Sequence, residues 1–432
     1  MSQHIESAFQ SHDYPRYSSH MTSTVTPHSH TRHQGADGST KILPSTQAVA
    51  FNSHKSFQDV TAENVVSGAF QGSEVYNDWI LPNQLHVLDG AYLEWTVSWT
   101  SDAAAGANDT IVSKPAWQQI SHVTYMFESG NDTEQLRGVE QHLLWTNATS
   151  PEDYSRDAAS YGMDSVNRAQ VRAWGVATGN SQVFTRTYRI RLGGFLQNPL
   201  FVSGIADDQC RIRVTWSGSQ TTSKVGNPVG PTMTGARLIC EETQLDTGNY
   251  NRLMAQYRSG NGVHFRYCEL RNSVHPFTVT ANQQVDVTMT SHSGLVAGLM
   301  VFIRSQSQVG TGPTTFLSLT SLQLKNERNL KVTEVRSDEQ LKSLIYRSCD
   351  FPSGNGAQQV SSYFVPLNSS LYASLSAGIF SGGYKCSGRD LLSIVCSNDM
   401  QNANGGSIQV EICSINWNYL HISNGRVRVE KS

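Results

Sequence analysis

Two adjacent pairs of carboxylates are the residues best suited by type to acid or base chemistry. Asp207 is followed by Asp208, and Glu241 is followed by Glu242. Neighbouring residues of a strand point to opposite faces, so neither pair can readily share a proton or a substrate. We interpret both pairs as solvated residues of turns or strand edges, and we predict no catalytic residue.

Histidine and cysteine could supply metal ligands or nucleophiles. His28, His30 and His33 are closely spaced, but they lie in a polar, low-complexity segment that is typical of a tail. Seven further histidines are dispersed along the chain, at His86, His122, His142, His264, His275, His292 and His421. The seven cysteines are widely spaced and form no C-x-x-C pair, so reduced, buried thiols are favoured over zinc ligands. We therefore predict no metal site and no cofactor.

The common signatures of enzymes are absent from the sequence. It contains no G-x-S-x-G, no G-x-x-x-x-G-K-[ST], no H-E-x-x-H and no G-x-G-x-x-G after a predicted strand. The net charge of -3 argues against a dedicated nucleic-acid-binding protein. Charged residues make up only 16% of the chain. The uncharged polar residues that replace them lower the desolvation cost of packing large subunit surfaces together, but a loop-rich all-β protein has the same composition.

The second half of the sequence repeats the strand order of the first. Three alternating strands of the first half have counterparts in the second half. The strand with Val123, Tyr125 and Phe127 corresponds to the one with Leu322 and Leu324, and the strand with Tyr188, Ile190 and Leu192 corresponds to the one with Tyr363, Val365 and Leu367. The strand with Ile212, Val214 and Trp216 corresponds to the one with Leu392, Ile394 and Cys396. The interval from Tyr188 to Tyr363 is 175 residues, which is the size of a domain rather than of a solenoid repeat. The pattern indicates two copies of one β-domain.

A short amphipathic helix is predicted after the first of these strands in each half. In the first half, the capping pair and the apolar positions are Asp132, Gln135, Leu136, Val139 and Leu143. In the second half they are Ser337, Gln340, Leu341, Leu344 and Ile345. The caps would satisfy the first amides of each helix, and the apolar residues recur at helical spacing.

Repeated strands with few helical segments predict an all-β fold of two tandem eight-stranded jelly rolls, with short helices and long loops. We place a flexible N-terminal arm at residues 1–55, the first jelly roll at 56–250, the second at 251–425 and a C-terminal tail at 426–432. The arm holds half of the histidines and has too little apolar periodicity to fold alone. Residues 147–180 should form a long loop, and the glycine-containing stretch 247–262 should link the rolls.

The C-terminal region carries a resemblance to a known family. Residues 415–425 read INWNYLHISNG and follow an alternating apolar strand. This segment resembles the closing strand of double jelly-roll major capsid proteins, the lineage that includes tectivirus-like bacteriophages, adenovirus hexons, virophages and polinton-like viruses. Residues 124–130, the later 143–145 and the spacing from Arg189 to Trp216 are similar to the first roll of those proteins. The resemblance covers about residues 56–425 and lies in the order of the motifs more than in identity.

The resemblance implies that two jelly rolls stand side by side, and that three chains form a homotrimeric, pseudo-hexagonal capsomer that tiles an icosahedral shell. The implied partners are neighbouring capsomers, penton and minor capsid proteins, and an internal membrane or packaged DNA on the inner face. The arm and the basic residues Arg426, Arg428 and Lys431 could lie on that face, although a solvated tail fits the sequence equally well. The resemblance places the protein in the virion. Because its N-terminus lacks a secretion signal, we expect it to fold and assemble inside the host cell.

Two other functions remain open at this level. A β-sandwich carbohydrate-binding or viral attachment protein would need exposed Trp and Tyr side chains, whereas the aromatic residues here mostly occupy the alternating positions of predicted cores. A jelly-roll lyase or hydrolase would need close carboxylates or His–Tyr pairs in a cleft, and no sequence motif brings them together. We therefore predict a major capsid protein that is not an enzyme.

Overall fold

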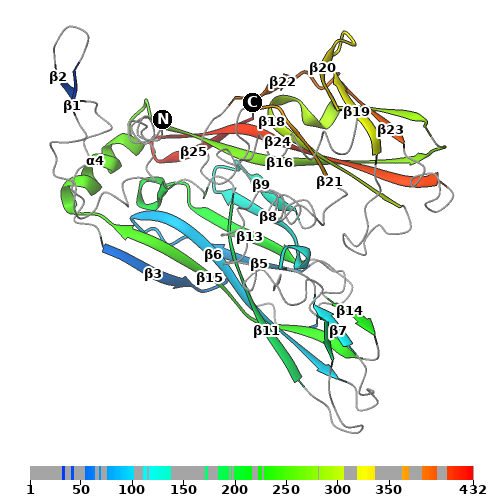
Figure 1. Ribbon diagram of the computed structural model, residues 1–432. Helices are drawn as coiled ribbons and strands as arrows, with labels where there is room; N and C mark the ends of the chain where they lie inside the picture. The colour runs from blue at the N-terminus through cyan, green and yellow to red at the C-terminus, as the bar shows by residue number, and fades with distance from the viewer. Residues whose placement is uncertain are drawn as a thin grey trace.

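The structure is a computed structural model of the chain, and strands make up most of it (Figure 1). The residues that it describes are 32–34, 40–42, 54–63, 68–69, 75–101, 110–113, 116–137, 171–173, 183–193, 196, 199–216, 222–225, 228–280, 282–305, 319–335, 362–368, 382–396 and 406–431. Two pairs of packed antiparallel sheets account for most of the strands, and each pair encloses a core of its own.

The first pair of sheets forms the first roll. One sheet has the order β11-β6-β15-β3, with β4 and β12 attached to its sides, and the other has the order β5-β13-β8-β9. These strands are β3 (His54–Val60), β4 (Gly68–Ala69), β5 (Tyr76–Ile80), β6 (Val87–Ser101), β8 (Ile120–Phe127), β9 (Thr133–Arg137), β11 (Val183–Arg191), β12 (Leu200–Phe201), β13 (Cys210–Trp216) and β15 (Pro228–Gln244). A small sheet at the far end of this roll joins β7 (Thr110–Ser113), β10 (Val171–Ala173) and β14 (Thr222–Val225).

The second pair of sheets forms the second roll. Its orders are β16-β24-β18-β21, with β22 and β25 attached, and β17-β23-β19-β20. The strands are β16 (Val263–Thr278), β17 (Gln284–Thr288), β18 (Gly294–Ser305), β19 (Leu319–Lys325), β20 (Lys331–Val335), β21 (Ser362–Pro366), β22 (Tyr384–Cys386), β23 (Leu391–Cys396), β24 (Ser407–Ser423) and β25 (Arg426–Lys431). A separate hairpin pairs β1 (Arg32–Gln34) with β2 (Thr40–Ile42).

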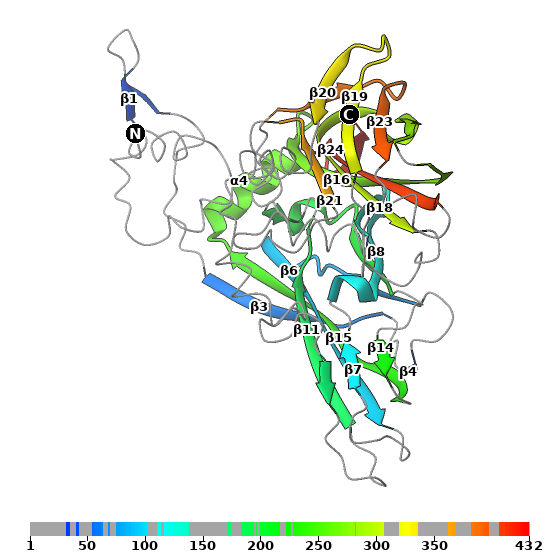
Figure 2. The ribbon, with the colours of Figure 1, turned by 45° about the vertical axis from the view of Figure 1, so that its right-hand side comes forward.

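The two rolls have the same topology. When the eight main strands of each roll are counted along the chain, one sheet contains strands 6, 3, 8 and 1 in that order, and the other contains strands 2, 7, 4 and 5. This is the arrangement of an eight-stranded Greek-key jelly roll, and it occurs twice. The predicted double jelly-roll is therefore confirmed, and each strand pair matched in the sequence occupies the same position in the two rolls. Figure 2 shows the rolls one above the other, as does the first view.

Aromatic residues fill the first core. Trp95 stacks on Tyr188 with a centroid distance of 5.3 Å and meets Trp216 edge-on at 5.2 Å. The indole N–H groups of Trp95 and Trp216 donate to Gln119 Oε1 at 2.9 Å and to Asn77 Oδ1 at 2.7 Å. Both rings are completely buried, and each indole N–H keeps a hydrogen-bond partner.

The prediction of a helix after residue 132 is wrong over the part that the structure describes. Thr133–Arg137 is the strand β9, which pairs with β8 and places Tyr125 opposite Thr133. Pairing with β8 and burial of Thr133 outweigh the local capping signal, since propensity is weak against tertiary contacts. The later positions of that helix, and all of its counterpart after Ser337, lie outside the described residues.

Two segments that the sequence sets apart have regular structure. The stretch expected to link the rolls contains the helix α4 (Thr247–Tyr257), which begins where the Asp246 carboxylate accepts from the amide of Asn249 at 2.9 Å. The residues expected to form a tail are the strand β25, which pairs with β24. The 3-10 turns η3 (Ala116–Gln119), η5 (Val202–Ile205) and η6 (Thr290–His292) complete the described elements, and no described helix has the length and apolarity needed to cross a lipid bilayer.

Candidate functional site

The two rolls share a pair of long strands. β16 and β24 run antiparallel for their whole length, and each contributes to both cores (Figure 1). On β24, Ile408 and Ile412 are buried in the second core, whereas Leu420 and Ile422, farther along the same face, are buried in the first core. On β16, Tyr267 is buried in the first core. We call this pair of strands the shared ribbon, and it makes the junction of the rolls the candidate functional site.

The middle of the shared ribbon is polar although it is buried. Ser414, Asn416 and Asn418 of β24 lie between the two apolar ends of that strand and are fully buried, and Glu269 of β16, opposite Asn416, is also buried. The Glu269 carboxylate accepts from Asn418 Nδ2 and from Arg271 Nε, the latter at 3.1 Å. Buried polar groups are stable only when each finds a partner, so these bonds fix how the ribbon passes from one core to the other.

Arg271 connects this polar segment to the second roll. Its guanidinium donates to the carbonyl oxygen of Ser293 at 2.7 Å and to Asn418 Oδ1 at 3.2 Å, and Asn416 Nδ2 donates to the same Ser293 carbonyl at 3.1 Å. Lys431 Nζ of β25 lies 3.8 Å from the second oxygen of Glu269. The acid therefore has two cations beside it and is not an isolated buried charge.

A buried histidine closes the other end of the polar segment. The ring nitrogens of His292 lie 2.7 Å from Ser414 Oγ and 2.7 Å from Ser273 Oγ, and Ser273 Oγ also meets His275 Nε2 at 2.9 Å. Burial, and then the charges of His275 and Arg271, lower the pKa of His292 from 6.5 to about 4. The ring is therefore neutral in the folded protein at neutral pH.

Acidification is expected to destabilise the junction through His292. In the unfolded chain the imidazole binds a proton below about pH 6.5, whereas the folded protein resists this until about pH 4, so stability falls as the pH drops through that window. The full loss is roughly 3 kcal/mol. Urea unfolding of the wild type and of His292→Gln at several pH values checks this, because glutamine does not titrate. Equal pH slopes for the two proteins would refute the assignment.

A carboxylate bridges the first roll to β25. Asp208 Oδ1 accepts from the Ser129 amide at 2.7 Å, and Oδ2 accepts from the Val427 amide at 2.7 Å. The carbonyl oxygen of Val427 accepts from Asn131 Nδ2 at 3.0 Å. The interpretation of Asp208 as a solvated residue is wrong, because its side chain is buried at the point where the last strand meets the first roll.

The second carboxylate pair also contains a buried member. Glu242 accepts from the His86 amide at 2.8 Å, from Gln58 Nε2 at 2.7 Å and from Ser56 Oγ at 3.2 Å. A register shift in β15 lies between Glu241 and Glu242. The solvated interpretation is therefore wrong for Glu242 as well, and the carboxylate serves to hold the edge strand β3 on its sheet.

An ion-pair ladder covers the outer face of the β5-β13-β8-β9 sheet. Arg213 donates two hydrogen bonds of 2.8 Å to the carboxylate of Asp78. Arg211 forms ion pairs with Glu63 at 2.6 Å and with Asp78 at 3.4 Å. Burial raises the pKa of Asp78, but the hydrogen bonds and charges of Arg213 and Arg211 outweigh it and leave the pKa below its usual value. The Arg213 guanidinium also lies 4.2 Å from the centroid of the Tyr76 ring. The ladder ties neighbouring strands together.

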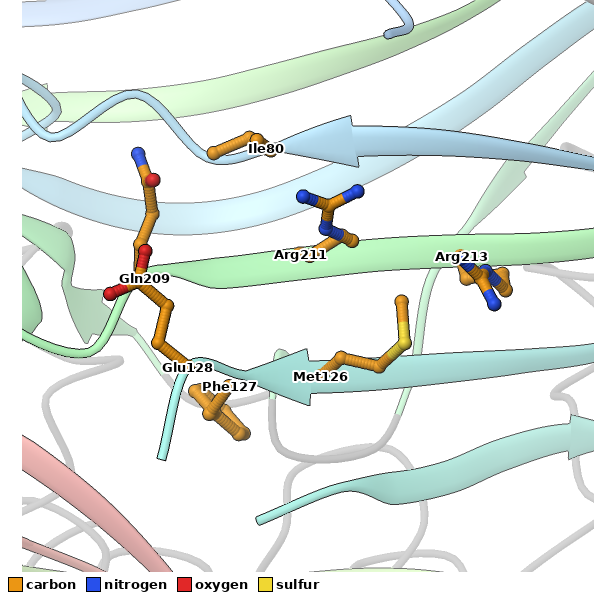
Figure 3. Close-up of a pocket in the computed structure, with 7 residues that line it drawn as sticks. All are labelled: Ile80, Met126, Phe127, Glu128, Gln209, Arg211 and Arg213. Atoms are coloured by element: carbon orange, nitrogen blue, oxygen red, sulfur yellow. The ribbon is translucent and has the colours of Figure 1, made fainter. Parts of the chain in front are cut away.

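A shallow hollow of about 290 Å³ lies beside this ladder (Figure 3). Figure 3 shows that its lining comes from three neighbouring strands and the turns next to them: Ile80, Met126, Phe127, Glu128, Gln209, Arg211 and Arg213. Gln209 is occupied by bonds to Leu81 O and Asn83 Oδ1. Arg211 is paired with carboxylates. The hollow therefore holds no acid and base placed to act together on one substrate.

In the described part of the chain, four of the dispersed histidines come together in pairs: His275 and His292 both contact Ser273, and His264 stacks on His421. No group of three or more His, Cys, Asp or Glu residues is placed there to hold a metal ion. His86 accepts from the Leu245 amide at 2.9 Å, and His122 lies 3.3 Å from Thr215 Oγ1. His33 lies on β1, whereas His28, His30 and His142 are not among the described residues. Burial raises the pKa of the Cys210 and Cys240 thiols, which therefore stay protonated and poorly nucleophilic.

Comparison with known proteins gives structural matches alone. No protein-family model matches the chain, and no curated protein sequence matches it. The chain is similar to the quasi-atomic model of the PBCV-1 virus capsid, with a TM-score of 0.63 and 12% identity over 88% of this chain and 97% of that one.

Two further matches are major capsid proteins. The Faustovirus protein has a TM-score of 0.55 and 8% identity over 86% of this chain and 91% of that one. The mavirus protein has a TM-score of 0.50 and 9% identity over 87% of this chain and 90% of that one. At such low identity the matches establish a common fold and nothing finer, but they extend over both rolls. The chain therefore has the double jelly-roll fold found in viral major capsid proteins.

Proposed function

We propose that this protein is the major capsid protein of an icosahedral virus and that it has no enzymatic activity. The observation that carries the proposal is the duplicated jelly roll with its shared ribbon. The match to the PBCV-1 capsid, which spans 88% of this chain and 97% of that one, supports it. Fold alone does not fix function. Here, however, the described residues offer structural bonds in place of a reactive site, which favours a structural role.

A homotrimer is the assembly that this chain suits best. Two rolls of equal topology per chain give six similar units around a threefold axis, and such a ring can pack as a hexagon among its neighbours. The junction bonds of Asp208 and Arg271 hold the rolls of one chain at a fixed angle, which a regular tile requires. The partners are then other copies of this chain, with penton and minor capsid proteins where the lattice changes, and the location is the virion.

Two uncharged hydroxyl pairs on the outer face of the β11-β6-β15-β3 sheet suit subunit packing, beside the ion pairs of Arg237 with Glu94 and Asp59. Thr96 meets Thr187 at 2.9 Å, and Ser98 meets Thr185 at 3.3 Å, which makes two hydroxyl pairs on neighbouring strands. Such uncharged groups cost little to desolvate when another subunit covers them. By contrast, the four Trp side chains that the structure describes, namely Trp79, Trp95, Trp216 and Trp417, are completely buried and cannot stack on a sugar.

Native mass spectrometry of the purified full chain tests the proposal. We expect a stable trimer, and we expect electron microscopy of concentrated samples to show hexagonal tiles or closed shells. A protein that stays monomeric at all concentrations, with its fold intact by circular dichroism, would contradict the capsomer assignment.

A further inference from the structure

The outer face of the shared ribbon gathers basic side chains at its first-roll end. The basic face, as we name it, consists of outward residues on three neighbouring strands: His264 and Arg266 on β16, Tyr419 and His421 on β24, and Arg426 and Arg428 on β25. Strand register places His421 between His264 and Arg428, and Tyr419 opposite Arg266. The side chains of His264, Arg266, Arg426 and Arg428 are exposed.

The side chains of Arg426 and Arg428 remain exposed to a ligand. The rings of His264 and His421 are stacked in parallel with a centroid distance of 4.1 Å. Arg428 Nε lies 3.5 Å from Glu430, yet the arginine side chain remains 73% exposed. Among the described residues, Arg426 forms no ion pair. Glu430 is the one acid among the outward residues of these strand ends, so the face is positive although the whole chain carries -3.

We infer that the basic face binds the phosphate backbone of nucleic acid. This inference rests on the proposed function and adds a partner to it, since a shell subunit with such a face on its inner side would meet the enclosed genome. Cations spread over three strands can contact several phosphates at once, and such contacts give affinity without reading a base sequence.

The composition of the face favours nucleic acid over a lipid surface. Surfaces that bind membranes combine basic residues with apolar side chains that enter the bilayer. The exposed large apolar residues in the described part of the chain are Phe57, Tyr76, Val274 and Leu330, and none of them belongs to the basic face. Val274 lies on the same strand as Arg266 but in its second-roll half.

Fluorescence anisotropy with the full chain and a short labelled DNA duplex tests the inference over a range of salt concentrations. For the double variant Arg426→Glu with Arg428→Glu we expect the affinity for DNA to fall about tenfold or more. The slope of log affinity against log salt concentration should become shallower by the equivalent of about two phosphate contacts. The matched control is Arg328→Glu with Arg389→Glu, which changes the charge equally at exposed sites of the second roll and should weaken binding far less.

The outcomes separate this inference from the proposed function. Equal weakening by the control pair, or binding to phosphatidylserine vesicles but not to DNA, would overturn the assignment of nucleic acid to this face. Trimers that form normally and bind no DNA would overturn the inference and leave the capsid proposal standing. Native mass spectrometry of each variant verifies that the assembly is unchanged.

Discussion

Replacement of Asp208 by alanine is expected to destabilise the folded protein by about 2–5 kcal/mol. The substitution removes the acceptor for the amides of Ser129 and Val427, and each amide that is left without a partner costs roughly 1–3 kcal/mol where water cannot replace the carboxylate. The effect should be large because the Val427 bond is buried and joins the last strand to the first roll. The midpoint of urea unfolding measures it.

Asp207→Ala is the matched control for this substitution. Asp207 is the neighbouring residue of the same type, but it is exposed, so its removal should change stability by no more than about 0.5 kcal/mol. If the two variants unfold at the same urea concentration, Asp208 does not hold the rolls together. Assembly should follow stability, because a loosened β25 alters the angle between the rolls.

The second large effect is expected at Glu269 and Arg271. Their side chains are 7% and 16% exposed, so either single alanine variant leaves a poorly solvated charge, at a cost of about 3–5 kcal/mol. The double variant removes both charges and should lose much less than the sum of the single effects. We expect a coupling energy of about 1–3 kcal/mol from the double-mutant cycle.

The ion pair of Lys331 and Glu334 supplies the control cycle. It has similar geometry, with 2.9 Å between Nζ and Oε2, but the lysine is 51% exposed. Exposed pairs contribute about 0–1 kcal/mol, so this cycle should give little coupling. A coupling energy at Glu269 and Arg271 no greater than in the control would show that burial adds nothing to the junction pair.

The sequence predicted the architecture well because strand alternation survives in both rolls. Tyr188 and Tyr363 lie on the sixth main strand of their rolls, and Val214 and Ile394 lie on the seventh, as the spacing indicated. The resemblance to capsid proteins rests on the same order of elements. Neither alternation nor resemblance says which strands extend beyond their own roll, so the shared ribbon did not follow from them.

The polar junction could not be predicted because its pattern has two meanings. Ser414, Asn416 and Asn418 alternate with apolar residues, which is typical of a strand with one solvated face. In the structure both faces of this part of β24 are buried, and the polar side chains bond across the ribbon. Asp208 and Glu242 were misread for the same reason, since a carboxylate in sequence gives no sign of distant amides that it will accept from.

The shared ribbon also bears on the timing of synthesis. Leu420, Ile422 and Val427 are buried in the first core, yet the ribosome adds them about 180 residues after Gln244, where the last strand of that roll ends. The N-terminal half therefore cannot complete its interior while translation is under way, and must wait with apolar surface uncovered. Polypeptides that stop short would remain open at that surface, which gives chaperones and proteases a means to remove them before they reach a growing particle.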